Sequence, residues 1–258
     1  MHILLTSDDG MDAEGLWCLY DELVGIANVS VIVPKLDSSG VSHAITLRQP
    51  LRAGELFRHG EQAGWWVQGT PVDCVKLGIT HLLETPVDLV VSGINHGPNV
   101  GENLFYSGTV AAAVEAQIQN TAGIAVSLDV ASGRDFTSAA KWAAAFILEE
   151  LGGVTGEALL LNINIPGSWA NIKGIRLTTQ SRSGFREEYE RRQDPNGEDY
   201  FWVKGQMHVS EGNDQFDAAA LTAQYISITP LHIDLTDYRH LEDLHDLEKD
   251  FHENPDPR

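Results

Sequence analysis

Short apolar runs alternate along the chain with segments whose apolar residues repeat at helical spacing. The runs interpreted as strands are HILLT (2–6), VSVIV (29–33), WWVQG (65–69), DLVVS (88–92), GIAVSL (123–128), ALLLNINIP (158–166) and YISITPL (225–231). Helices are expected between them, at about 12–25, 71–83, 108–119 and 135–151. Strands that alternate with helices form parallel sheets with helices on both faces. The pattern therefore predicts an α/β fold with a three-layer core around a parallel sheet.

The chain changes character near residue 179. The segment SRSGFREEYERRQDPNGEDYFWVKG (181–205) is polar and has a DPNG turn between a charged part and an aromatic part, which predicts a protruding β-hairpin. Phe201 and Trp202 are apolar residues on this arm, so we expect the arm to be an oligomer contact outside the active site. The acidic residues beyond Asp234 are interpreted as a solvated helix or a frayed end. We expect one domain over residues 1–258, with a core at about 1–178 and 218–232, an arm at about 179–212 and an acidic tail at about 233–258.

Composition limits the partners and the compartment. The 258 residues carry a net charge of −20, which argues against binding to nucleic-acid polymers or anionic membranes. The negative charge does not exclude a small phosphorylated substrate, because a bound divalent cation can reverse the local electric field. The N-terminus lacks the basic segment and apolar run of a signal peptide, and no apolar stretch is long enough to span a bilayer. Cys18 and Cys74 show no paired spacing, so we expect reduced thiols in the cytoplasm.

An acidic pair follows the first predicted strand, in LLTSDDG (4–10). Asp8 and Asp9 repel each other and lose hydration as the site closes, so a cation must compensate them or a pKa must rise. No lysine or arginine lies near them in the sequence. The compensating charge must therefore come from elsewhere in the fold or from a metal ion.

Polar segments follow three of the predicted strands. If these strands are parallel neighbours, residues 7–9, 37–42 and 92–109 meet at one edge of the sheet, where ligands of such sheets bind. The carboxylates of Asp8 and Asp9, with the neutral oxygens of Ser39 and Asn95, form a hard-oxygen site suited to Mg²⁺ or Mn²⁺.

The segment SGINHGPNVGENLFYSGT (92–109) also has the features of an anion-binding loop. Its glycines allow the backbone to approach a ligand closely. Ser107, Gly108 and Thr109 lie at the start of a predicted helix, where free N–H groups and the helix dipole favour phosphate. A metal site beside a phosphate-binding helix start indicates metal-assisted transfer of a phosphoryl group to water.

Other interpretations remain open on the residues alone. An acidic pair after a strand can simply cap the next helix, serine is a common turn residue at a position such as Ser39, and no GxGxxG or P-loop fingerprint is present. The ten histidines show no metal-ligand spacing, and His96, inside the glycine-rich loop, is the one kept as a candidate. A phospho-receiver module also has an acidic pair after its first strand, and a non-catalytic metal- or nucleotide-binding protein would keep the same ligands.

Several motifs resemble those of one known family, the SurE survival-protein nucleotidases, over nearly the whole chain. They are LLTSDDG (4–10), DSSGVSHAIT (37–46), GTPVDCVKLGI (69–79), SGINHGPNVGENLFYSGTVAAAVEA (92–116), LLNINIP (160–166), DPNGEDYFWVKG (194–205) and YISITPL (225–231). The combination of the acidic pair with the longest motif is the most specific part of the resemblance. Ser7, Ala112 and Gln224 depart from it, because the family usually has Asn, Gly and Gly at these positions.

The resemblance implies a fold, an activity and a set of site residues. The fold would be a Rossmann-like core with an extended arm, and the activity a metal-dependent phosphomonoesterase acting on nucleoside 5′-monophosphates and often 3′-monophosphates. One divalent ion per subunit would be bound by Asp8, Asp9, Ser39 and Asn95, the two aspartates being the catalytic candidates. The phosphate-facing positions would be Asn99, Ser107, Gly108 and Thr109. Family members form dimers or tetramers by exchanging C-terminal elements.

Overall fold

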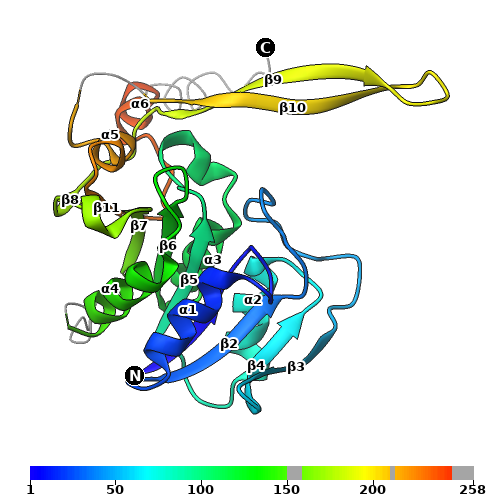
Figure 1. The fold of residues 1–258 in the computed structure, drawn as a ribbon, viewed down its shortest axis with the longest axis vertical. Helices are drawn as coiled ribbons and strands as arrows, with labels where there is room; N and C mark the ends of the chain where they lie inside the picture. The colour runs from blue at the N-terminus through cyan, green and yellow to red at the C-terminus, as the bar shows by residue number, and fades with distance from the viewer. Residues whose placement is uncertain (150–158, 210–212, 246–258) are drawn as a thin grey trace.

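The computed structural model describes residues 1–149, 159–209 and 213–245, and it has a large, mostly parallel sheet at its centre (Figure 1). The described residues form nine strands of this sheet, in the order β3-β4-β2-β1-β5-β6-β7-β11-β8. The mutually parallel strands are β4 (Glu61–Val67), β2 (Asn28–Pro34), β1 (His2–Thr6), β5 (Leu89–His96), β6 (Ala122–Asp129) and β7 (Leu160–Pro166). At the edges, β3 (Ala53–Arg58) is antiparallel to β4, while β11 (Ile226–Pro230) is antiparallel to β7 and parallel to β8 (Ile175–Leu177).

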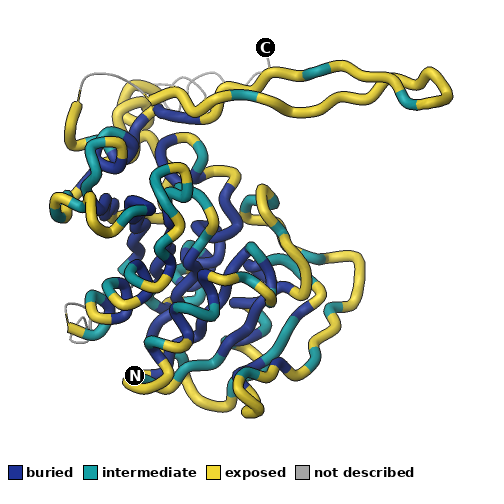
Figure 2. Tube along the Cα trace, in the orientation of Figure 1, coloured by how far each residue is buried: buried dark blue, intermediate teal, exposed yellow. Residues whose placement is uncertain are grey.

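Helices cover both faces of the sheet, so the core has three layers. On one face lie α1 (Glu14–Leu23) and α4 (Phe136–Glu149), and on the other lie α2 (Pro71–Leu77) and α3 (Gly108–Ile118). The side chains of β1 divide between the two faces as strand alternation requires. Ile3 and Leu5 pack with α1 and α4, and Leu4 packs with α2 and α3. The central strands are accordingly buried on both sides (Figure 2).

The remaining elements are short apart from one hairpin. They are η1 (Gly78–Leu82), η2 (Gly101–Phe105), η3 (Trp169–Asn171), α5 (Asp217–Thr222) and α6 (Tyr238–Asp243). The predicted arm is present as the antiparallel strands β9 (Gly184–Gln193) and β10 (Asp199–His208), which extend away from the core in Figures 1 and 2. No helix in the described ranges is long and apolar enough to cross a membrane.

The α/β prediction is confirmed, with differences at the edges of the sheet. The sheet is not wholly parallel, because β3 and β11 run against their neighbours β4 and β7. The helix expected to reach residue 83 ends as α2 at Leu77 and continues as the π-helical turn η1. Helix α6 is exposed, which agrees with the predicted solvated tail. Three predicted parts lie outside the described residues: the tail at 246–258, the end of the helix predicted to residue 151, and the start of the strand predicted from residue 158.

The loop at residues 35–52, which carries Ser39, has no helix or strand and is held in place by side chains of α2 and α3. Asp73 of α2 accepts hydrogen bonds from the backbone N–H of Thr46 at 3.0 Å and from its hydroxyl at 2.6 Å. Glu115 of α3 binds the Nε2 atom of His43 at 3.0 Å. The two carboxylates fix the far side of the loop, and so they limit where Ser39 can lie.

Glu115 should make the protein sensitive to acid. Its side chain is 2% exposed. Burial alone would raise its pKa, but hydrogen bonds from His43, Lys76 and Gln119 outweigh burial and lower the pKa to about 2. Because the folded-state pKa lies below the unfolded value of about 4.3, this stabilisation is present above that pH and is lost as the pH falls toward 2. Glu115→Gln should therefore unfold more easily at pH 7, by about 1–2 kcal/mol, and the difference should shrink toward pH 3.

Thermal unfolding at pH 7 and at pH 3 measures this effect, with Glu84→Gln as the control. Glu84 is exposed, and the same substitution there should change stability little at either pH. A Glu115→Gln deficit that stays constant between the two pH values would contradict the ionised, hydrogen-bonded state of Glu115.

Candidate active site

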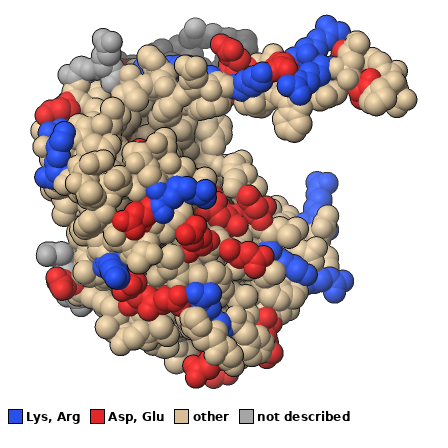
Figure 3. All heavy atoms as spheres, in the orientation of Figure 1, with Lys and Arg blue, Asp and Glu red and all other residues tan. Residues whose placement is uncertain are grey.

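The predicted site lies where the order of the strands reverses. The chain leaves β1 toward β2 on one side and returns to β5 on the other side, so a crevice forms at the carboxyl ends of β1 and β5. A pocket of about 370 Å³ opens there, and Asp8, Ser39, Asn95, Asn99 and Ser107 are among the residues that line it. The surface of the molecule is deeply indented beneath the arm (Figure 3). Residues far apart in the sequence thus meet at one edge, as expected from the strand pattern.

Asp8 is the most deeply buried acidic group of the pocket, at 3% exposure. Its Oδ1 atom accepts a hydrogen bond of 2.5 Å from the hydroxyl of Thr109. Burial and the neighbouring charge of Asp9 raise the pKa of Asp8 to about 6, although the bond from Thr109 opposes the rise. Asp8 therefore resists carrying a negative charge unless a cation lies beside it.

Asp9 is half-buried and lies next to the pocket rather than in its lining. Its Oδ2 atom accepts a hydrogen bond of 2.8 Å from the backbone N–H of His96, and its own N–H donates to the Ser7 hydroxyl at 3.3 Å. Burial raises the pKa of Asp9, and the charge of Asp37 adds to the rise. The acidic pair thus connects the end of β1 to the end of β5.

Local bonds orient the two neutral donors. A register shift in β5 between Ser92 and Asn95 turns the end of the strand toward the pocket. The Asn95 Nδ2 atom donates to the carbonyl of Gly97 at 2.8 Å, which leaves its Oδ1 atom to coordinate a ligand. The Ser39 hydroxyl donates to Asp37 at 2.6 Å, and its lone pairs remain available.

These residues fit a divalent cation. No lysine or arginine is among the described residues that line the pocket, so no side chain there neutralises the carboxylate of Asp8. Across the described parts of the chain, no three His, Cys, Asp or Glu side chains form a metal-binding group. The candidate donors predicted from the sequence are two carboxylates, one hydroxyl and one amide, a hard-oxygen set that would suit Mg²⁺ or Mn²⁺ better than a softer metal.

The start of α3 forms the second part of the site. Ser107 is the N-cap of α3, and its Oγ atom accepts from the backbone N–H of Val110 at 3.1 Å while keeping its own proton to donate. The helix start also lies very close to Asp8. A Cβ atom added to Gly108 would be 2.8 Å from the Cβ of Asp8, so only glycine allows this approach.

Asn99 is held rigidly at the edge of the sheet. Its backbone N–H donates to Asn164 at 2.7 Å, and its carbonyl accepts from the amides of Asn162 at 2.8 Å and Asn164 at 3.0 Å. Its Nδ2 atom donates one proton to Ser127 at 2.9 Å and carries a second. The LLNINIP strand therefore serves the site through its two asparagines, a role that the sequence pattern did not indicate.

Thr109 differs from the expectation that its side chain faces phosphate. The side chain is fully buried and its hydroxyl donates to Asp8. The backbone N–H of Thr109 also lies beside the Asp8 carboxylate, where it lowers the pKa of that group, so an anion would have to share this N–H with Asp8. Thr109→Val should therefore weaken Mn²⁺ binding as well as phosphate binding. Loss of a hydrogen bond to a charged group costs about 1.5–3 kcal/mol, or at least about tenfold in affinity.

Separate calorimetric titrations with Mn²⁺ and with inorganic phosphate measure the two effects. Thr109→Ser keeps the hydroxyl and should retain most of the Mn²⁺ affinity. If Thr109→Val binds Mn²⁺ as the unmodified protein does, the hydroxyl of Thr109 does not support a metal-binding carboxylate.

The base of the arm also lines the pocket, so the expectation that the arm lies outside the active site is wrong for its base. Phe185 and Glu187 of β9 and Val203 of β10 border the same pocket as Asp8, together with Asn103 and Tyr106 of the glycine-rich segment. The hairpin could be read from the DPNG turn, but its position over the pocket depends on long-range contacts. No pattern within residues 181–205 indicated it.

His96, kept as a candidate, lines the pocket beside Asn95. Its ring stacks on Phe136 with centroids 6.4 Å apart, and its Nε2 atom lies 3.0 Å from a guanidinium nitrogen of Arg134. Its backbone, rather than its ring, contacts Asp9. The structure thus gives His96 a packing role at the rim of the pocket.

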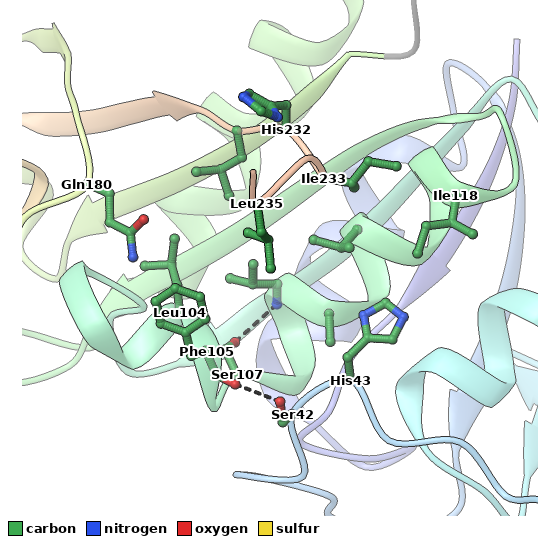
Figure 4. A pocket seen from close by; sticks show the side chains of 14 residues that line it. Ser42, His43, Leu104, Phe105, Ser107, Ile118, Gln180, His232, Ile233 and Leu235 are labelled. Atoms are coloured by element: carbon green, nitrogen blue, oxygen red, sulfur yellow. Dashed lines mark hydrogen bonds between the residues drawn. The ribbon is translucent and has the colours of Figure 1, made fainter. Parts of the chain in front are cut away.

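A second pocket, of about 350 Å³, shares Ser107 with the first (Figure 4). Its lining is largely apolar, from α3, η2 and the segment after β11, and includes Leu104, Val110, Val114, Ile118, Leu231 and Leu235. Figure 4 shows the hydroxyl of Ser42 pointing to the carbonyl of Phe105, a hydrogen bond of 2.6 Å. None of the described residues that line this pocket is acidic, so the pocket at Asp8 is the candidate for metal chemistry.

Comparisons with known proteins agree on one family. The family model described as "Survival protein SurE" matches residues 3–187. The chain is 44% identical over 244 residues to 5′-nucleotidase SurE of Syntrophomonas wolfei subsp. wolfei, and this alignment covers 94% of this chain and 92% of the relative. It is 44% identical over 247 residues to 5′-nucleotidase SurE of Desulforamulus reducens, and this alignment covers 95% of this chain and 97% of the relative. The crystal structure of the Sure protein from Aquifex aeolicus has a TM-score of 0.83 at 35% identity and covers 96% of this chain and 100% of that chain.

Proposed function

Because the chain belongs to the survival protein SurE family, we propose that it is a metal-dependent 5′-nucleotidase, which hydrolyses a nucleoside 5′-monophosphate to the nucleoside and phosphate. We extend the proposal to 3′-monophosphates. The observation that carries it is the pocket in which Asp8, Ser39 and Asn95 lie beside the N-terminus of α3. A cation site next to an anion site is what phosphate-ester hydrolysis requires.

The proposed ligands of one Mg²⁺ or Mn²⁺ ion per subunit are Asp8, Asp9, Ser39 and Asn95. Support comes from the raised pKa values of both aspartates and from the orientation of the two neutral donors. Each aspartate would be easier to ionise with a cation beside it. The phosphate is proposed to lie against Asn99, Ser107 and the backbone N–H groups of Gly108 and Thr109.

The chain's own groups would act mainly by positioning and by charge. When bound, the divalent ion supplies Lewis-acid stabilisation of the charge on the phosphoryl oxygens. The N–H groups at the start of α3 and the second Nδ2 proton of Asn99 would donate to the same oxygens and fix the phosphorus in place. The carboxylates of Asp8 and Asp9 would hold the ion.

A phosphate-release assay with AMP and Mn²⁺ tests the function, with EDTA as the control. We expect release that EDTA abolishes and that added Mn²⁺ restores. A phospho-receiver module or a non-catalytic binding protein would release no phosphate from AMP in either condition. Release that EDTA leaves unchanged would contradict the metal requirement.

We also propose that the chain forms a homodimer or homotetramer through its arm and C-terminal elements. Phe201 and Trp202 on the outer part of the arm are 59% and 57% exposed. Replacing both by serine should lower the mass measured by light scattering while the pocket at the arm's base stays intact. An unchanged mass would contradict a contact through the outer arm.

A cytoplasmic location is proposed from the cysteines. Both Cys18 and Cys74 are free, and Cys74 is buried. Free buried thiols are usual in a reducing compartment.

A further inference from the structure

The pocket extends outward from Asp8 to aromatic and apolar side chains. Tyr106 precedes Ser107, and Phe185 and Val203 come from the base of the arm. We propose that this outer part of the pocket is a nucleoside subsite, in which Tyr106 and Phe185 provide ring surfaces for the base. The proposal rests on the function proposed above and assigns to the arm a role in substrate affinity.

The first support is the sidedness of the hairpin. Cross-strand partners share a face, so one face of the arm carries the apolar pairs Phe185–Met207 and Tyr189–Val203, with Glu187 and Gly205 between them. Near the base of the arm, the pairing of Arg186 with Gln206 and of Glu188 with Lys204 gives the other face charged and polar residues, and Trp202 and Tyr200 follow on that face toward the tip. The face with Phe185 and Val203 borders the pocket, because these two residues and Glu187 between them line it. An arm surrounded only by solvent would not require apolar side chains at the place where it meets the pocket.

The second support is the rigid attachment of the arm to the residues before Ser107. The backbone N–H of Phe185 donates to the Asn103 side chain at 3.1 Å, and the N–H of Glu102 donates to the carbonyl of Ser183 at 2.7 Å. The backbone of Tyr106 is tied to the Ser39 loop, because its carbonyl accepts from the N–H of Ser42 at 3.0 Å. The two rings therefore extend from a backbone that is fixed relative to the phosphate-binding helix start.

The third support is the chemistry of the surface. Tyr106 is 61% exposed and Phe185 is 39% exposed, so both rings have area that a ligand can cover. Aromatic rings bind nucleobases by stacking, at about 1–3 kcal/mol for each base and with little dependence on its identity. Glu187 also lines the pocket, and its carboxylate can accept hydrogen bonds from the hydroxyl groups of a ribose. A cavity of about 370 Å³ has room for a nucleoside monophosphate.

The test compares a substrate that has a base with one that lacks it. Tyr106→Ala and Phe185→Ala should each raise KM for AMP by about 5–150-fold, the equivalent of about 1–3 kcal/mol, with kcat changed much less. KM for ribose 5-phosphate should change by less than about threefold in the same variants, because it has no base to stack. Tyr189→Ala is the matched control. Tyr189 lies on the same face of β9, is 67% exposed and is not in the pocket lining, so its loss should leave both KM values unchanged.

Binding of adenosine to the EDTA-treated protein separates this proposal from the proposed function. Saturation-transfer NMR should detect adenosine on the unmodified protein and a signal at least about threefold weaker on Phe185→Ala. If AMP is not hydrolysed but adenosine binding still depends on Phe185, the function fails and the subsite stands. If AMP is hydrolysed and both variants change the two KM values equally or not at all, the subsite is wrong and the function stands.

Discussion

Asp8→Asn should abolish phosphate release from AMP and leave the fold intact. The substitution keeps the size of a side chain that is 3% exposed, and the amide oxygen can still accept from Thr109. It removes the charge that the proposed site offers to a divalent ion, and a neutral amide is a much weaker ligand for Mg²⁺ or Mn²⁺. We expect the rate with AMP and Mn²⁺ to fall to the background measured with EDTA.

The same substitution should stabilise the metal-free protein at neutral pH. Burial raises the folded-state pKa of Asp8 to about 6, above the unfolded value of about 3.9. The cost of ionising Asp8 is therefore fully present above about pH 6 and absent below about pH 4. Asp8→Asn should gain up to about 3 kcal/mol in EDTA at pH 8, and the gain should vanish at pH 4.

Thermal unfolding in EDTA at the two pH values, beside the activity assay, measures both effects. Asp12→Asn is the matched control, since Asp12 is an exposed residue of the same loop and does not line the pocket. An Asp8→Asn variant with full activity, or with a stability gain that does not depend on pH, would remove Asp8 from the proposed ligands.

Gly108→Ala should reduce the rate by at least about 100-fold while costing only about 1–3 kcal/mol of stability. The new Cβ would lie 2.8 Å from the Cβ of Asp8 and 3.2 Å from Pro71, so the start of α3 must move away from the acidic pair. A displacement of about 1 Å separates the phosphate-binding N–H groups from the metal-binding carboxylates, and catalysis is far more sensitive to this than folding is.

Gly25→Ala is the control for this prediction. A Cβ at Gly25 meets no atom within 4 Å, so the substitution should change neither activity nor stability appreciably. Gly108→Ala should therefore show a much lower phosphate-release rate and a lower unfolding temperature than Gly25→Ala. Near-normal activity of Gly108→Ala would show that the close approach of α3 to Asp8 is not required.

Local signals in the sequence were sufficient for many of these features. Thr70, Pro71 and Asp73 predicted the start of α2, where the hydroxyl of Thr70 accepts from the N–H of Asp73 at 3.1 Å. Ser107 marked the start of α3 in the same way. These contacts span only a few residues, so a local pattern contains all the information that they need.

Features set by distant contacts were missed or misread. The hydroxyl of Thr109 donates to Asp8, 101 positions away in the sequence. Nothing near Thr109 in the sequence indicates that this hydroxyl contacts Asp8 rather than a phosphate. Strand β3 was not predicted, because it lies at the edge of the sheet, where Leu56 is its one buried residue in the described structure and no apolar run forms. The place of Phe185 at the pocket follows from the attachment of the arm to Asn103, which no periodicity encodes.

The proposed ion ligands come from three separate parts of the chain, after β1, after β2 and at the end of β5. An unfolded chain does not hold positions 8, 39 and 95 together, so it should bind the ion far more weakly than the native chain does. By mass action, an ion at 100 times its dissociation constant would then add about 2.7 kcal/mol to the free energy of unfolding. The melting temperature should accordingly rise with the concentration of Mn²⁺, and a chelator should make the whole molecule, and not only its catalysis, more fragile.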